Sequence, residues 1–318
     1  MTLKRSILLL ATGLIGVALV FGVPEKLHVP DAGAAGLAAI PASVTQASLV
    51  PQWTERTAPP DPGIPKRPRL RCGSSLVIDN VTGEILYARD ADKVRPIASL
   101  TKLLTALVFL ESGTDIMNTA TVTREDAYRS SRSHLRVGYE LRLRDFLAAG
   151  LVSSDNRAAR VLARSAGMPR LEFITRMNEK AKELGLDSTF VVEPTGLANL
   201  NESTARDCAV LLHVALQNHL IQRLTTLHDI DIKPLNSRRT LHLVNTNRLL
   251  RYGYDFIGGK TGYISEAGWC IAARGFSDDG HDVTAIILGA PTNSLRFRSL
   301  RNALLWAYRF PTRPAARS

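Results

Sequence analysis

Apolar and polar positions predict strands near both ends of the folded part of this chain. An apolar run at 75–79, turn residues at 81–83 and a second run at 84–88 predict a β-hairpin. Three further strands, separated by turns, are predicted at 257–263, 268–274 and 283–289. The two groups of strands are therefore separated by most of the length of the chain.

In the sequence between these two groups of strands, apolar residues recur at the spacing of helices. The apolar run Leu103–Leu110 has helical length, and Pro96 shortly before it suits a helix start. Further helices are predicted at 143–149, 156–166, 169–184, 204–217 and 293–308. The segment 111–142 has a mixed pattern. This order of strands, helices, strands and a final helix predicts an α+β fold, in which an antiparallel sheet uses strands from both ends and encloses a central helical insertion.

The N-terminal part has the pattern of an export signal. Lys4 and Arg5 precede an apolar segment, Ile7–Val23, and small residues follow at 32–35. This predicts a signal peptide or a membrane anchor at 1–35. Proline-rich composition predicts an extended or disordered linker at 36–70, in which Trp53 has no assigned role. The folded domain is predicted at 71–318, in the periplasm or otherwise outside the cytoplasm.

Composition adds a constraint on partners. The net charge of +11 suits an anionic cell wall or membrane surface. The basic residues are scattered and match no nucleic-acid motif, so nucleic acid is not expected. Arg296, Arg298 and Arg301 of the last helix are expected on a solvated face. Neither the seven histidines nor Cys72, Cys208 and Cys270 form a metal motif, and at most one disulfide is possible.

Candidate chemistry begins at the start of the first long helix. Ser99 and Lys102 are three residues apart, which places them on one helix face. A serine hydroxyl becomes a nucleophile when a neighbouring base takes its proton, and a lysine can act as that base when burial or nearby cations lower its pKa. A Ser-x-x-Lys pair alone is common, so further motifs must support this interpretation.

Two other motifs complete a set. Ser154-Asp155-Asn156 lies between two predicted helices, and Lys260-Thr261-Gly262 lies in a predicted strand. Ser99-x-x-Lys102, Ser154-x-Asn156 and Lys-Thr-Gly each occur once in the chain. In this order they resemble the serine enzymes that bind penicillin, a superfamily that the same three motifs define. The resemblance implies the fold shared by β-lactamases and transpeptidases, with a five-stranded antiparallel sheet flanked by helices.

Each motif has a physical interpretation. Ser99 would attack an acyl carbon, Lys102 would accept its proton, and the Ser154 hydroxyl would relay that proton to the leaving amine. Asn156 would bind Lys102 and a substrate amide. Lys260 would present a fixed positive charge to a substrate carboxylate and keep Lys102 deprotonated by repulsion.

The rest of the third motif would bind substrate. The Thr261 hydroxyl would bind the same carboxylate as Lys260, and Gly262 would let the substrate backbone lie against the strand. The resemblance further implies that the backbone N–H groups of Ser99 and Tyr263 stabilise the oxyanion. No metal or cofactor is needed for this chemistry.

A longer resemblance narrows the family. Glu193-Pro194-Thr195-Gly196-Leu197, the residues Asn201 to Ala205, and Asn245 to Asn247 are similar to segments of the D-alanyl-D-alanine carboxypeptidase and endopeptidase family. The resemblance covers about 72–311 and implies a penicillin-sensitive hydrolase of peptidoglycan stem peptides. The short C-terminal end favours the endopeptidase-like members, although removal of a terminal D-alanine stays open.

Two alternatives compete with this interpretation. A class A β-lactamase would use a glutamate in a Glu-x-x-Leu-Asn loop, but the residues after Glu193 have a different spacing. A non-catalytic penicillin- or peptidoglycan-binding module would be expected to have lost Ser99, Lys102 or Lys260. The family often has glycine where Asp155 stands, and the effect of this extra carboxylate on substrate choice stays open.

Overall fold

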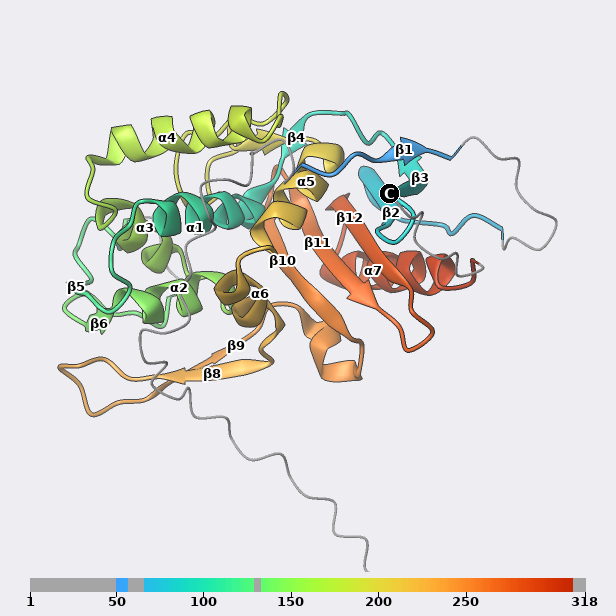
Figure 1. Cartoon of the computed structure of the whole chain (residues 1–318). Helices are drawn as coiled ribbons and strands as arrows, with labels where there is room; N and C mark the ends of the chain where they lie inside the picture. The colour runs from blue at the N-terminus through green and yellow to red at the C-terminus, as the bar shows by residue number, and fades with distance from the viewer. Residues whose placement is uncertain (1–49, 57–65, 129–132, 311–318) are drawn as a thin grey trace, which may run out of the picture. The chain divides into compact units, whose positions relative to one another are not determined.

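The computed structural model describes residues 50–56, 66–128 and 133–310 (Figure 1). The predicted signal or anchor at 1–35 and the greater part of the predicted linker at 36–70 lie outside these ranges. Within these ranges, no helix combines the length and the apolar character needed to cross a bilayer.

The largest sheet of the described chain brings the two groups of predicted strands together. Its order is β1-β3-β2-β12-β11-β10, and the five strands from β3 to β10 are antiparallel, as predicted. These five strands are β2 (Ser74–Asp79), β3 (Glu84–Arg89), β10 (Phe256–Ile264), β11 (Gly268–Phe276) and β12 (Asp282–Ala290). Strand β12 pairs with β2, so the N-terminal hairpin and the C-terminal strands form one continuous layer.

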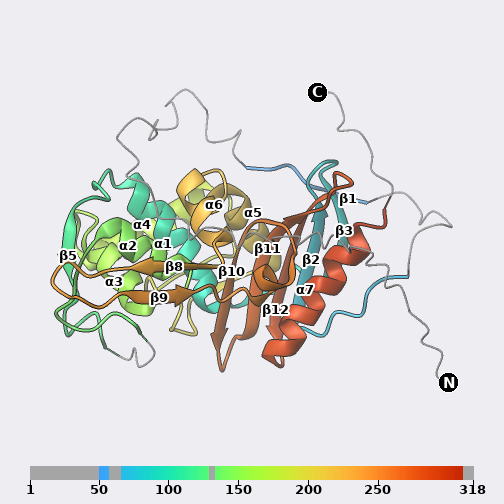
Figure 2. The same ribbon diagram turned by 90° about the horizontal axis from the view of Figure 1, so that it is seen from below.

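Helices cover both faces of this sheet (Figures 1 and 2). Because successive side chains of a strand point to opposite faces, Leu76 and Ile78 join the core on the helical-insertion side, whereas Val77 joins the core beneath the last helix. The insertion side holds α1 (Thr101–Glu111), α2 (Leu143–Leu151), α3 (Asn156–Arg164), α4 (Arg170–Glu183), α5 (Ala205–Ala215) and α6 (His219–Thr226). The opposite face carries α7 (Asn293–Ala307), which packs on β11, β12 and β2.

Sequence reasoning missed several short elements. The missed helix α6 has eight residues and is capped by Asn218, whose side chain accepts hydrogen bonds from the N–H groups of Leu220 and Ile221. The other elements missed are the pairs β4 (Arg95–Pro96) with β7 (Glu202–Ser203), β5 (Thr119–Thr121) with β6 (Glu140–Arg142), β8 (Asp229–Ile232) with β9 (Leu241–Val244), and the 3₁₀ helix η3 (Arg248–Tyr252). These strands are too short to give a clear alternating pattern.

A piece of the predicted linker belongs to the folded body. Strand β1 (Thr54–Glu55) pairs in parallel with β3, so the sheet has a sixth strand that was not predicted. Trp53, to which sequence reasoning gave no role, packs against the core, and its ring lies 6.2 Å from the ring of His213 in an edge-on contact. Arg206 of α5 also forms an ion pair with Glu55. The described residues 50–56 therefore cover the β3 edge of the sheet.

Candidate active site

Ser99 and Lys102 meet at the junction of a tight turn and a helix. Ser99 lies in the 3₁₀ turn η2 (Ala98–Leu100), which leads directly into α1, and Lys102 lies in the first turn of α1. The Lys102 Nζ atom is 2.9 Å from the Ser99 Oγ atom, in agreement with the predicted contact. Ala98 has a φ of 49°, a left-handed conformation that costs a non-glycine residue about 1–3 kcal/mol. This turn is therefore held in place by its surroundings.

Three oxygen atoms surround the Lys102 amine. Besides Ser99 Oγ, Nζ lies 2.7 Å from Asn156 Oδ1 and 2.7 Å from the Thr195 carbonyl oxygen. The two carbonyl oxygens can only accept hydrogen bonds, whereas a hydroxyl can donate or accept. A neutral amine can therefore donate its two N–H groups to Asn156 and Thr195 and direct its lone pair at the Ser99 hydroxyl. The predicted contact between Asn156 and Lys102 is present.

Burial allows the neutral form of the Lys102 amine to be populated near neutral pH. The Lys102 side chain is almost fully buried, and this burial lowers the pKa of Lys102 to about 7. The carboxylates of Glu193 and Asp155 raise the pKa in opposition, and the guanidinium of Arg160 lowers it further. The residue can thus hold or release a proton close to pH 7, which suits a general base.

Lys260 is the second buried amine of the site. It is 1% exposed, and its Nζ donates to the Thr261 carbonyl oxygen at 3.1 Å. Burial first, and then repulsion from Lys102 and Arg296, hold the pKa of Lys260 well below its ordinary value. Burial and repulsion therefore oppose the fixed positive charge expected at Lys260 in the protein alone. Repulsion from Lys260 was expected to keep Lys102 deprotonated, but burial is the largest cause of the lowered pKa of Lys102.

Gly262 is needed for a different reason from the one predicted. A Cβ atom at this position would lie 2.9 Å from the carbonyl oxygen of Ile97 and 2.9 Å from the backbone nitrogen of Ser99. The space beside Gly262 is thus filled by the turn that carries Ser99, not left for substrate. Gly196 contacts the same turn from another side, since its Cβ would lie 2.0 Å from the Ala98 carbonyl oxygen.

A Gly262→Ala substitution should therefore displace Ser99. We expect acylation by a labelled penicillin to slow by about 10- to 100-fold, because a shift of roughly 1 Å in a reacting group can cost that much. The control is Gly150→Ala in α2, which adds the same methyl group where the new Cβ would meet only the Ala158 Cβ, at an ordinary contact distance of 3.9 Å. Stopped-flow labelling would measure the rates, and a wild-type rate for Gly262→Ala would contradict the proposed packing.

The remaining residues of the third motif lie on the same strand. The Thr261 hydroxyl donates to Thr246 Oγ1 at 2.7 Å, and Tyr263 is half exposed and stacked on Trp269 with ring centres 4.0 Å apart. Arg296 of α7 donates from Nη1 to the carbonyl oxygens of Gly262 and Cys270, both at 3.2 Å. Its predicted place on a solvated face is wrong, because Arg296 is 4% exposed. It ties strands β10 and β11 to α7.

The second motif lies between α2 and α3. Ser154 has a φ of 61° and is partly buried, and its hydroxyl makes no hydrogen bond with any described residue. The Asp155 side chain caps α3 by accepting from the N–H groups of Arg157 and Ala158, and it also accepts a 2.6 Å bond from the Ser133 hydroxyl. The carboxylate whose role was left open is therefore used to hold the motif in place.

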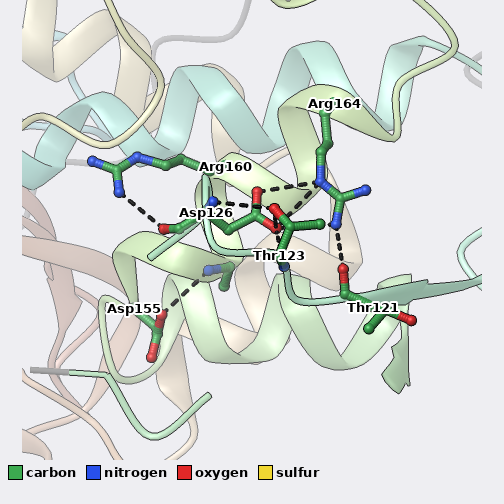
Figure 3. A network of polar contacts seen from close by, with 7 residues as sticks. Thr121, Thr123, Asp126, Asp155, Arg160 and Arg164 are labelled. Atoms are coloured by element: carbon green, nitrogen blue, oxygen red, sulfur yellow. Dashed lines mark hydrogen bonds and ion pairs between the residues drawn. The ribbon is translucent and has the colours of Figure 1, made fainter. Parts of the chain in front are cut away.

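A polar network fixes helix α3 from its other end (Figure 3). Arg160 donates to the backbone carbonyl oxygen of Asp126, and Arg164 forms a 3.0 Å ion pair with the buried Asp126 carboxylate. The same carboxylate accepts from the N–H and hydroxyl groups of Thr123. Helix α3 is thus held at both ends, and Asn156 in its first turn is positioned with it.

Glu193 belongs to the loop that supplies the Thr195 carbonyl. Its buried carboxylate accepts from the Thr195 N–H and hydroxyl groups at 2.8 and 2.6 Å and from the Leu197 N–H at 2.8 Å. It also lies 3.3 Å from the Ala198 nitrogen and from Asn201 Nδ2. These contacts occupy the carboxylate within its own loop, unlike the water-activating glutamate of a β-lactamase.

A Glu193→Gln substitution should loosen this loop. The amide would place an N–H₂ group against donors, and we expect a loss of about 2–3 kcal/mol in the free energy of unfolding. Penicillin acylation should fall as well, since the Thr195 carbonyl that orients Lys102 would be displaced. Urea unfolding measures the first effect, with Glu125→Gln on the exposed surface as the control. Equal stability of the two variants would contradict this role.

Sequence reasoning missed three contributors to the site. Thr195 acts through a backbone carbonyl, which carries no side-chain signal, and Glu193 had been considered only as a β-lactamase residue. Arg296 had been assigned to solvent. The positive φ of Gly196 marks a turn that the Pro194-Thr195-Gly196 sequence could have indicated. Cys72, Cys208 and Cys270 all carry free thiols, so the possible disulfide is not formed.

Comparisons with known proteins identify the family of the chain. Residues 62–292 match a family described as D-alanyl-D-alanine carboxypeptidase. The chain is 39% identical to a D-alanyl-D-alanine endopeptidase of Pseudomonas aeruginosa over 68% of its own length and 71% of the relative. It is 37% identical to the Escherichia coli protein of the same name, over 65% of this chain and 68% of that one.

A solved structure is similar in fold. The Streptomyces K15 DD-transpeptidase superposes with a TM-score of 0.73 at 27% identity, covering 77% of this chain and all of that chain. The β-lactamase- and transpeptidase-like architecture expected from the motifs is thus confirmed.

Proposed function

Since the chain belongs to the D-alanyl-D-alanine carboxypeptidase family, we propose that it acts through an acyl-enzyme on Ser99. It is a hydrolase of the carboxypeptidase and endopeptidase type that this family contains. The observation that carries this proposal is the set of three contacts at the Lys102 amine. Two carbonyl oxygens orient its N–H groups, and the remaining direction is that of the Ser99 hydroxyl. A lysine placed in this way is suited to accept a proton from serine.

Acylation would begin when Ser99 Oγ attacks the carbonyl carbon of a D-alanyl peptide bond. The hydroxyl proton passes to Lys102 Nζ as the new C–O bond forms. The tetrahedral intermediate carries its negative charge on the former carbonyl oxygen, for which the resemblance to the family implies the N–H groups of Ser99 and Tyr263 as donors. The intermediate then collapses, the C–N bond breaks, and the leaving amine takes a proton relayed from Lys102 by the Ser154 hydroxyl.

Deacylation would return the enzyme to its starting state. Water attacks the ester carbonyl carbon and gives a proton to Lys102. The C–O bond to Ser99 then breaks, and Lys102 returns this proton to Ser99 Oγ as the acid leaves. Lys102 thus serves as base when each nucleophile attacks and as acid when each leaving group departs. Its pKa of about 7 places both protonation states within reach at neutral pH.

Lys260, Thr261 and Asn156 would bind the substrate. A carboxylate placed against Lys260 would favour the charged form of this amine, because an opposite charge at close range raises the pKa of a lysine. Substrate binding would therefore favour the positive charge that burial and Lys102 oppose. The Thr261 hydroxyl would bind the same carboxylate, and the Asn156 amide a substrate peptide group.

The proposed substrates are D-alanyl bonds in the stem peptides of peptidoglycan, and β-lactams would acylate Ser99 in their place. The relatives that are named endopeptidases favour cleavage of cross-links, and removal of a terminal D-alanine is the competing reaction. Such substrates lie outside the cytoplasm. We accordingly propose that 1–35 directs export as a signal peptide or an anchor, that 36–70 includes a linker, and that 71–318 forms the catalytic domain.

Digestion of purified cross-linked muropeptides tests this function, with products resolved by mass. Loss of dimers to monomers would identify an endopeptidase, and loss of one alanine from pentapeptides would identify a carboxypeptidase. A labelled penicillin added to the same preparation should form a covalent adduct. A protein that gives neither product nor adduct would overturn the proposal and leave a non-catalytic binding module.

A further inference from the structure

The face of the molecule that carries α7 holds a group of basic side chains, here called the basic face. Four of them lie on the segment that leads into β2, and two lie on α7. All six are exposed: Lys66, Arg67, Arg69, Arg71, Arg298 and Arg301. The two elements are about 230 residues apart in the chain, so no local sequence pattern creates this group.

The two elements are joined in space. The backbone N–H of Arg71 donates to the Ser299 hydroxyl at 3.1 Å, and Figure 2 shows the segment before β2 running beside α7. A hollow of about 450 Å³ lies between them, lined by Arg69, Arg71, Arg298, Ser299 and Asn302. Three arginines thus line one concave surface.

The two stretches of sequence that form this face contain no acidic residues. The chain has no aspartate or glutamate at 66–78 or at 283–318. Among the described residues, no carboxylate forms an ion pair with any of the six side chains, in contrast to Arg164, Arg206 and Arg274, which pair with Asp126, Asp92 and Asp282. The cations of the basic face therefore keep their attraction for an external anion.

We propose that the basic face binds the surface of a membrane that contains anionic phospholipids. Leu305 is 43% exposed and lies on the same side of α7 as Arg298 and Arg301, so an apolar contact accompanies the charges. An apolar side chain among basic ones favours a lipid surface over a soluble polyanion.

Binding through this face leaves the candidate active site accessible. Helix α7 packs on one face of the sheet, and α1 and α5 pack on the insertion side, together with the turn that carries Ser99. The proposal consequently does not depend on the peptidase mechanism. Its variants should keep wild-type acylation by penicillin.

Sedimentation of the full chain with lipid vesicles tests the proposal. Vesicles of phosphatidylglycerol and phosphatidylcholine would be compared with phosphatidylcholine alone, at lipid concentrations where the neutral vesicles bind less than half of the protein. An Arg298→Glu/Arg301→Glu variant is expected to lose about tenfold or more of the preference for anionic vesicles, because each basic residue near such a surface contributes a severalfold gain. Raising the salt from about 0.1 M to about 1 M should abolish the preference, since the screening length falls from about 10 Å to about 3 Å.

An Arg238→Glu/Arg239→Glu variant supplies the matched control, because it makes the same charge change on the exposed loop between β8 and β9. It is expected to keep the wild-type preference. Equal binding to both kinds of vesicle, or equal losses in the two variants, would overturn the proposal. So would binding of soluble polyphosphate together with no preference for anionic vesicles. Unchanged penicillin labelling of both variants shows that they are folded.

Discussion

A Ser99→Ala variant is expected to form no covalent adduct with labelled penicillin and to hydrolyse muropeptides at least about 10⁴-fold more slowly than the wild type. The reason is that Ser99 Oγ is the hydroxyl placed 2.9 Å from the Lys102 amine. Removing it deletes the atom that would form the ester and leaves Lys102 without a proton to accept. Gel fluorescence measures the adduct, and mass spectrometry of the digestion products measures the hydrolysis.

The matched control is Ser112→Ala at the other end of α1. The Ser112 hydroxyl donates to the Phe109 carbonyl oxygen at 2.7 Å, and its loss should leave labelling unchanged. If Ser99→Ala were still labelled, peptide mapping of the adduct would locate another nucleophile. Ser154 is the first residue to test, since its hydroxyl makes no hydrogen bond with a described residue. Such an adduct would remove Ser99 from the proposed mechanism.

The large elements of the fold were predictable because their patterns are local. Strands such as β12 contain an apolar run, here Ala285–Leu288, that is buried on both faces and bounded by polar or turn residues. That strands from both ends of the chain share one sheet followed from the order of elements, whereas the pairing of β12 with β2 is seen only in the structure. Strand β1 could not be predicted, because two exposed residues in a proline-rich context carry no pattern. Its contacts with the edge of β3, the packing of Trp53 and the ion pair of Glu55 with Arg206 hold it in place.

The site was predictable to the extent that its contacts follow from spacing. Ser99 and Lys102 are three positions apart, a spacing that predicts their contact, and this contact is present. The Thr195 carbonyl reaches Lys102 across 93 residues, and the backbone nitrogen of Ser99 lies against Gly262 across 163. No pattern in the sequence encodes such approaches. The lowered pKa of Lys260 was not predicted for the same reason, since its burial and the proximity of Arg296 are tertiary properties.

Lys102→Arg is expected to reduce acylation by about 10³- to 10⁴-fold, as much as Lys102→Ala does. Arginine keeps a positive charge and hydrogen-bond donors but stays protonated, with a pKa above about 12, so it cannot take the Ser99 proton. If Lys102 served only to hold Asn156 Oδ1 and the Thr195 carbonyl oxygen in place, the arginine variant would retain substantial activity. The pair of variants thus separates a base from a structural cation.

The pH dependence of the wild type provides the second readout for Lys102. Burial lowers the pKa of Lys102 to about 7, and the neutral amine is the form that accepts a proton. The acylation rate should therefore rise as the pH increases through about 7 and level off above it, with the amine mostly protonated and inactive on the acid side. Rapid labelling with penicillin between about pH 5 and about pH 9 would measure this profile. A rate that stays constant across pH 7, or an arginine variant within tenfold of the wild type, would show that another group removes the proton from Ser99.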